Sequence, residues 1–189
     1  MNKKIFVMLA VLILVCSSIS YGYVFDRRTA GEEQAECQLL QGIVKNVGIG
    51  NYTGLALWLK NNLAYDTGIG NSSPWKYPFD TYKDGKGVCK DYALFTMECL
   101  KLMGVTDVFI LGVLNKDKTR GHAVVIFRPK QGSCWYFYSL EQLVIGPRNF
   151  RRLVECISYE SGYGIYPVYY LFSKDLQFIS PEDEKNWGL

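Results

Sequence analysis

The chain is 189 residues long, enough for one domain with a hydrophobic core and too short for two ordinary domains. Apolar residues make up 49% of it, charged residues 21% and aromatic residues 15%, which excludes disordered, collagen-like and low-complexity proteins. The net charge is only +3, and Lys3 and Lys4 contribute two of these charges, so no basic surface is expected that would bind nucleic acid.

Residues 1–20 have the pattern of a secretory signal peptide. Two lysines precede the apolar run 5–15, which is shorter than the roughly 20 residues that a transmembrane helix needs. Small residues predict cleavage after Ser20, which leaves residues 21–189 as a single domain, secreted or displayed at the cell surface. We expect no membrane association after cleavage. An uncleaved anchor or a lipidated Cys16 is the less favoured alternative.

Five cysteines remain after this cleavage: Cys37, Cys89, Cys99, Cys134 and Cys156. An odd number in an exported protein leaves at least one thiol unpaired, unless it pairs between molecules. If Cys89 is that thiol, the other four can form two disulfides in any of three connectivities. The alternative is that they are small buried apolar residues. No Cys-x-x-Cys motif supports a zinc ribbon or a thioredoxin site.

The first half of the exported chain has helical periodicity. Apolar residues at four-residue intervals predict a helix over 32–47, and a second helix is expected over 54–65. The segment 66–87 is rich in Gly, Ser, Asn and Pro and predicts a long loop, of a kind that is usually functional. A third helix is expected over 89–103.

After this helix the apolar pattern changes to that of β-strands. We expect three strands joined by short turns, at residues 107–114, 122–128 and 134–140. Short connections favour antiparallel neighbours. A short helix and a closing pair of strands are expected at residues 149–155, 167–172 and 176–179. Helices followed by an antiparallel sheet indicate the α+β class.

The segment 85–93 (GKGVCKDYA) places a cysteine at the start of a predicted helix. Its two glycines let the backbone turn sharply before the helix. Unpaired N–H groups and the positive end of the helix dipole favour the thiolate of Cys89. Lys90 adds positive charge, whereas Asp91 opposes it. Cys89 is therefore a candidate nucleophile, although buried structural cysteines are more common.

The chain has a single histidine, His122, at the beginning of a predicted strand. One histidine excludes a metal site built from several, and we expect neither a metal nor a cofactor. A cysteine at a helix start that faces a histidine on a strand is the arrangement of a thiolate–imidazolium nucleophile.

Several motifs together resemble the transglutaminase-like superfamily. They are YPFDT, GVCKDYA and LMGV within 77–105, GHAV at 121–124 and WYF at 135–137. The segment 59–66 (LKNNLAYD) is similar to the helix before the family's active-site loop. The resemblance covers roughly residues 54–145. It implies a papain-like core in which N-terminal helices, including the nucleophile helix, pack on an antiparallel sheet.

The resemblance also implies a Cys-His-Asp triad, with Cys89 as nucleophile and His122 as the base that later protonates the leaving amine. Ser139 occupies the place of the aspartate, and its hydroxyl can accept the imidazole N–H but cannot offset the imidazolium charge. Glu141, two residues on and hence on the same face of a strand, is the alternative third member. The backbone N–H of Cys89 and the side chain of Trp75 are candidate oxyanion donors.

We therefore expect an exported, monomeric cysteine enzyme that cleaves or transfers amide bonds through a thioester. Its substrate is expected to be a protein, a peptide or a cell-wall amide, and hydrolysis is favoured because the resemblance implies that small microbial members are mainly hydrolases. The alternative is a non-catalytic transglutaminase-like domain that binds protein or glycan. Ser139 favours that alternative, whereas the presence of Cys89 and His122 in their motifs favours the enzyme.

Overall fold

The computed structural model describes residues 29–68, 73–164 and 168–179. The predicted signal peptide, 1–20, lies outside these residues. The helices are α2 (Ala30–Val47), α3 (Tyr52–Asn62), α4 (Pro78–Asp84), α5 (Cys89–Leu102) and α6 (Phe150–Glu160). The strands are β1 (Ala64–Tyr65), β2 (Lys86–Gly87), β3 (Asp107–Leu114), β4 (Gly121–Arg128), β5 (Tyr136–Ser139), β6 (Gln142–Ile145), β7 (Val168–Phe172) and β8 (Phe178–Ile179). None of the helices described is both long and apolar enough to cross a membrane.

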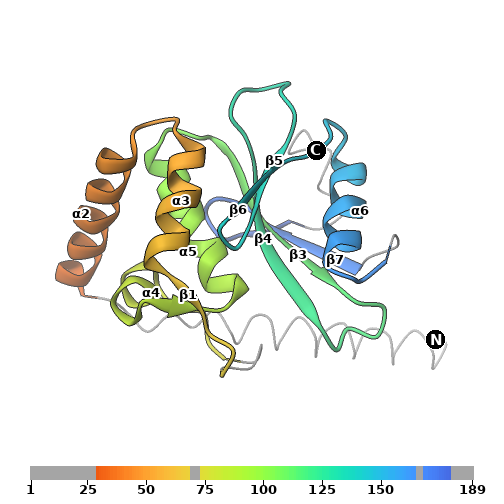
Figure 1. Cartoon of the computed structure of the whole chain (residues 1–189), viewed down its shortest axis with the longest axis horizontal. Coiled ribbons are helices and arrows are strands. Elements are labelled where there is room, and N and C mark those ends of the chain that lie inside the picture. The colour runs from red at the N-terminus through yellow and green to blue at the C-terminus, as the bar shows by residue number, and fades with distance from the viewer. Residues whose placement is uncertain (1–28, 69–72, 165–167, 180–189) are drawn as a thin grey trace, which may run out of the picture.

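A six-stranded antiparallel sheet divides the molecule into two layers of core. Its strand order is β6-β5-β4-β3-β7-β8. Helices α2 to α5 cover one face, and α6 covers the other (Figure 1). The predicted α+β class, with the helix that begins at Cys89 packed on an antiparallel sheet, is confirmed.

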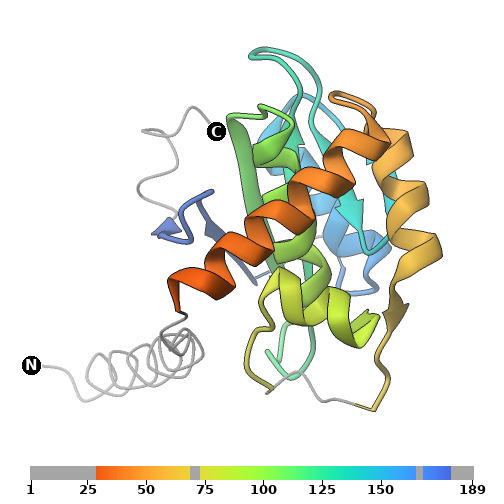
Figure 2. The same ribbon diagram turned by 90° about the vertical axis from the view of Figure 1, so that its left-hand side faces the viewer.

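Helix α5 is the central element of the larger core. Its residues from Cys89 to Met97 are all buried, because β3 and β4 lie on one side of it and α2 and α4 on the other. Figure 2 shows α2 lying across the outer side of α5. A helix that is enclosed on all sides must be apolar nearly all round. The two charged residues of its first turn, Lys90 and Asp91, therefore need specific partners.

The helix boundaries follow from local capping. Thr29 and Glu32 form a capping box, with the Thr29 N–H donating to Glu32 Oε2 at 2.8 Å, so α2 begins two residues before the predicted start. Asn149 caps α6 by accepting the Arg152 N–H at 3.0 Å. Helix α6 continues to Glu160, five residues beyond the prediction.

The predicted loop 66–87 is wrong in its second half, where α4 and β2 form. Pro78 opens α4, and Gly85, with φ of 63°, ends it in the left-handed conformation that favours glycine. Strand β2 pairs in parallel with β1, through Ala64 and Lys86. The predicted second helix accordingly ends at Asn62, before β1.

The predicted strand 134–140 is shorter than expected, and a further strand follows it. β5 ends at Ser139, the turn Leu140–Glu141 reverses the chain, and β6 pairs with β5 through Ser139 and Gln142. Leu140 has φ of 56°, a turn conformation that a leucine does not announce in a sequence.

Cys37, Cys89, Cys99, Cys134 and Cys156 all lie in the described residues, and each is free. Cys89 and Cys99 are buried, whereas Cys37 and Cys156 are exposed. The structure thus agrees with unpaired thiols rather than with two disulfides.

Candidate active site

A buried carboxylate fixes the start of α5. Asp91 Oδ2 accepts the Val88 N–H at 3.0 Å, and Asp91 Oδ1 accepts the Lys76 N–H at 2.9 Å. The first of these bonds satisfies a backbone donor just before the helix, and the second ties the helix to the segment before α4. Gly87 leaves room for this carboxylate, because a Cβ at Gly87 would lie 2.9 Å from the Asp91 Cβ. The GKGVCKD motif therefore builds a rigid platform for Cys89.

Lys90 places a positive charge beside that cysteine. Its Nζ donates to the backbone oxygen of Ser73. Burial lowers the pKa of Lys90, while the charges of Asp91 and Cys89 oppose this change. The charge of Lys90 lowers the pKa of Cys89 and the charge of Asp91 raises it, as expected from the sequence.

Cys89 is the first residue of α5, and only 7% of it is exposed. Its sulfur accepts hydrogen bonds from the backbone N–H groups of Ala123 and Lys90. Burial raises the pKa of the thiol and outweighs these bonds and the charge of Lys90. Since Ala123 directly follows His122 in β4, the bond brings the start of α5 next to the histidine in the fold.

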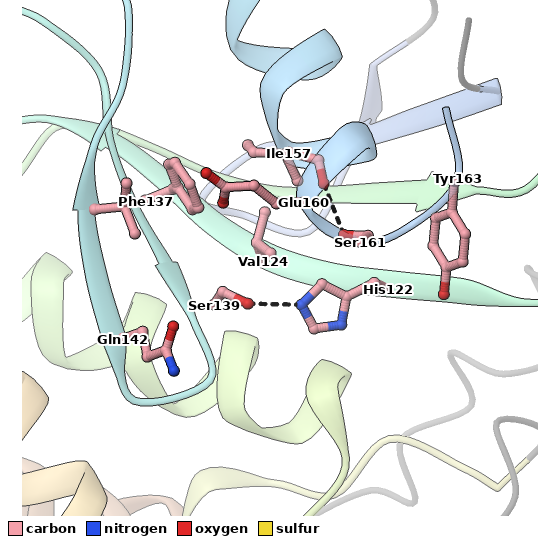
Figure 3. A pocket seen from close by; sticks show the side chains of 10 residues that line it. His122, Val124, Phe137, Ser139, Gln142, Ile157, Glu160, Ser161 and Tyr163 are labelled. Atoms are coloured by element: carbon pink, nitrogen blue, oxygen red, sulfur yellow. Dashed lines mark hydrogen bonds between the residues drawn. The ribbon is translucent and has the colours of Figure 1, made fainter. Parts of the chain in front are cut away.

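His122 is hydrogen-bonded to Ser139. The His122 Nε2 and Ser139 Oγ atoms are 2.9 Å apart (Figure 3). The β4–β5 register, in which Val125 pairs with Tyr138, makes the two residues diagonal neighbours on one face of the sheet. Burial lowers the pKa of His122. In the free protein the pKa values of the thiol and the imidazole therefore shift in the directions that oppose an ion pair.

Glu141 lies in the turn between β5 and β6, so the expectation that it shares a strand face with Ser139 is wrong. Its charge acts instead on Tyr92 of α5. Burial, with a smaller contribution from Glu141, raises the pKa of Tyr92 to about 12. Ser139 is thus the predicted third residue that the structure joins to His122.

Three tyrosines that were not among the predicted site residues lie near Cys89. The pKa of each of Tyr65, Tyr163 and Tyr170 is raised, first by burial and next by the charge of Cys89. Tyr170 fits because its strand partner is Gly112: a Cβ at Gly112 would lie 2.1 Å from the tyrosine ring. A glycine within an otherwise apolar strand is the one signal in the sequence that could have indicated this close approach.

A pocket of about 260 Å³ lies beside His122 and Ser139, on the face of the sheet that α6 covers. Val124, Phe137 and Ile157 form apolar parts of its wall (Figure 3). The ring of Trp75, the candidate oxyanion donor, packs edge-on against Phe172, with centroids 6.2 Å apart. Among the residues that the structure describes, no group of three or more His, Cys, Asp or Glu could hold a metal ion.

Residues 49–135 match a family model described as a transglutaminase-like domain. The match includes the Cys89 and His122 motifs and ends at Trp135, just before the strand that bears Ser139. It confirms the resemblance found in the sequence and, with the fold, the expected papain-like transglutaminase core.

Solved structures similar to this transglutaminase-like chain include Legionella pneumophila LapG. One LapG structure is 19% identical to this chain. The alignment covers 92% of this chain and 92% of the LapG chain, with a TM-score of 0.49. The calcium-bound LapG structure is 20% identical to this chain. The alignment covers 84% of this chain and 83% of the LapG chain, with a TM-score of 0.47. A Cytophaga hutchinsonii protein, whose name ascribes cysteine protease activity to it, is 17% identical over 73% of this chain and 47% of its own, with a TM-score of 0.37. No curated protein shows significant similarity to the chain.

Proposed function

We propose that this transglutaminase-like protein is a cysteine enzyme that cleaves amide bonds, with Cys89 as nucleophile and His122 as base. The observation that carries the proposal is the 2.9 Å hydrogen bond from His122 Nε2 to Ser139, on the strand whose next residue, Ala123, donates to the Cys89 sulfur. A helix-start cysteine, an imidazole and a group that orients the imidazole are the parts of an activated thiol.

The hydrogen bond to Ser139 is compatible with a protonated Nε2 and a basic Nδ1 on His122. If Nε2 carries the proton and donates it to Ser139 Oγ, Nδ1 is the basic nitrogen. Nδ1 takes the thiol proton as the Cys89 sulfur attacks the amide carbon. When the C–N bond breaks, His122 returns this proton to the leaving amine, and a thioester remains on Cys89. Water then hydrolyses the thioester, with His122 again taking and returning a proton, and a carboxylic acid is released.

The oxyanion of each tetrahedral intermediate requires hydrogen-bond donors. The first N–H groups of a helix have no acceptor within the helix and lie at the positive end of its dipole. The Cys89 N–H, at the first residue of α5, is such a donor. It is our candidate for the oxyanion hole.

The shifts in pKa imply that proton transfer accompanies the attack on the substrate. The raised pKa of Cys89 and the lowered pKa of His122 both favour the neutral pair, thiol and imidazole, in the free protein. Ser139 orients the ring but leaves the imidazolium charge without an anion. In serine proteases, replacing the triad aspartate by an amide lowers kcat about 10⁴-fold, so we expect modest turnover here.

The proposal includes the setting of the reaction. We infer that residues 1–20 direct export and that the enzyme acts as a monomer outside the cell or at its surface. Its substrate would be a protein, a peptide or a cell-wall amide, and water the acceptor. The competing proposal, a non-catalytic domain that binds protein or glycan, is favoured by the serine at 139 and by the burial of Cys89.

The experiment is a screen of peptide pools and cell-wall fragments with the wild-type protein and the Cys89→Ala variant. We expect cleavage by the wild type, an acyl adduct on Cys89 in the intact mass, and no cleavage by Cys89→Ala with an unchanged Tm. Cys156→Ala, which alters an exposed thiol, is the matched control and should cleave normally. Cleavage by Cys89→Ala would contradict a mechanism with Cys89 as nucleophile. Absence of both cleavage and adduct in the wild type would favour the non-catalytic binding domain.

A second comparison identifies the third residue. Ser139→Ala removes the hydroxyl bonded to His122, whereas Glu141→Gln changes a turn residue. We expect Ser139→Ala to lower turnover more than Glu141→Gln. The opposite order would assign the role to Glu141.

A further inference from the structure

The pocket beside His122 has one charged group at its α6 end. Of the described side chains that line it, Glu160 alone carries a formal charge at neutral pH, because the lowered pKa of His122 leaves the imidazole neutral. Figure 3 shows Glu160 separated from His122 by Val124. The pocket thus has a reactive end, at His122 and Ser139, and a negative end, at Glu160.

The negative charge of Glu160 is not compensated by its own helix. Glu160 is the last residue of α6, where the helix dipole already places partial negative charge, and the last turn of α6 contains no basic residue. Within the described part of the chain, no salt bridge joins Glu160 to a lysine or an arginine, whereas Glu155 on the same helix pairs with Arg151. An uncompensated carboxylate at a helix C-terminus attracts a cation.

The walls between the two ends combine polar groups with the apolar groups that the stem of a side chain could contact. Val124, Phe137 and Ile157 contribute apolar surface, while Ser161 lies next to Glu160. The volume of about 260 Å³ is close to the lower limit for ligand pockets and fits one side chain rather than a large molecule. Long basic side chains bury their methylene groups along apolar surface and keep the charged end at a polar group.

Charge also differs along the site as a whole. Burial raises the pKa of Tyr163, and Arg120 opposes this change, so a cation lies near that tyrosine. Tyr163 is also one of the tyrosines whose titration Cys89 affects. Tyr163 also lines the pocket, so a cation and the Glu160 carboxylate both act on this region.

We propose that this pocket binds a cationic side chain of the substrate, an ammonium group on an aliphatic stem as in lysine, with the ammonium at Glu160. Binding of the cation at Glu160 does not depend on the proposed function. Only the statement that the bound group is part of a substrate rests on it. Because the pocket adjoins the histidine that protonates the leaving amine, the lysine-like group would belong to the amine side of the scissile bond.

The single histidine of the chain provides a direct test by NMR. Nα-acetyl-lysine methylamide and its neutral analogue, Nα-acetyl-norleucine methylamide, are titrated into the protein while the His122 ring signals are followed. We expect saturable shifts with the lysine probe, a Kd at least about tenfold higher for the norleucine probe, and a lower His122 pKa in the lysine complex. Glu160→Gln should remove the preference, and Glu155→Gln, on the same helix but outside the pocket, should preserve it.

Equal affinity for the two probes, no shift with either, or a lysine preference that persists in Glu160→Gln would each overturn the proposal. The readout is independent of turnover. A lysine preference combined with full activity of Cys89→Ala would sustain this pocket and refute the proposed function. Loss of activity in Cys89→Ala, combined with no preference for the lysine probe, would support the proposed function and refute this pocket.

Discussion

His122 Nε2 and Ser139 Oγ lie 2.9 Å apart across the antiparallel pair of β4 and β5. In the triad implied by the resemblance to transglutaminase-like proteins, position 139 would hold an aspartate, whereas the serine of this protein makes the contact without a negative charge. The low pKa of His122 agrees with that absence of charge, because burial disfavours the imidazolium and Ser139 offers no compensating anion.

Restoring the acid should therefore strengthen the base. In Ser139→Asp, a carboxylate beside the imidazole stabilises its charged form and raises the pKa of His122 above that of the wild type. The rate of acylation of Cys89 should rise with it. The His122 ring signals in a pH titration by NMR measure the first effect directly.

Ser139→Asn is the matched control, because it provides an acceptor of similar size without charge. We expect the His122 pKa in Ser139→Asn to stay near the wild-type value. An unchanged pKa in Ser139→Asp would show that position 139 does not contact the ring in solution.

Asp91 should be essential for the position of Cys89. Asp91→Ala leaves the N–H groups of Val88 and Lys76 without their acceptor in a buried place, and we expect a loss of about 2–4 kcal/mol in the free energy of unfolding. Urea unfolding measures this loss. Asp117→Ala, in the exposed β3–β4 turn, should change stability by less than about 0.5 kcal/mol. Equal effects of the two substitutions would contradict the role of Asp91.

The sequence predicted the elements whose pattern is local. β3 was predicted residue for residue, because its apolar run is bounded clearly on both sides. The start of α5 was also predicted, since two glycines precede Cys89. In contrast, α4 has only 7 residues and β6 only 4, too few for a period to appear. Leu140, in a left-handed conformation, gives no turn signal.

The candidate site was predictable in its motifs but not in its surroundings. The local sequence context predicted Cys89 and His122, and the resemblance to transglutaminase-like proteins implied the position of Ser139. The contact of Tyr170 with Gly112 depends on how β7 pairs with β3, and the pocket at Glu160 depends on where α6 packs. Pairings between distant segments leave no trace in the pattern of one sequence. The balance between burial and charge that sets the pKa of Cys89 likewise requires the folded structure.

Gly112 should be intolerant of any side chain. The Cβ of Gly112→Ala would overlap the Tyr170 ring, and we expect a loss of about 1–3 kcal/mol in the free energy of unfolding, together with displacement of the ring from the site. Tyr170→Ala should relieve most of this cost, so the double-mutant cycle would show strong coupling.

Gly42→Ala is the opposite control. Gly42 lies in α2 with open space around it, and alanine there should stabilise the protein by about 0.5–1 kcal/mol. A Gly112→Ala variant as stable as the wild type would mean that β7 pairs differently from the register described.

The most direct test of the account is the rate of Cys89 alkylation as a function of pH, followed by mass spectrometry in the wild type and in His122→Ala. Exposed Cys37 and Cys156 serve as internal references. The wild-type rate should rise as His122 loses its proton, at a pKa that burial lowers, and rise again as the Cys89 thiol ionises, at a pKa that burial raises. His122→Ala should lose the first rise and react about a hundredfold more slowly at pH 7. Identical profiles for the two proteins would show that His122 does not act on Cys89.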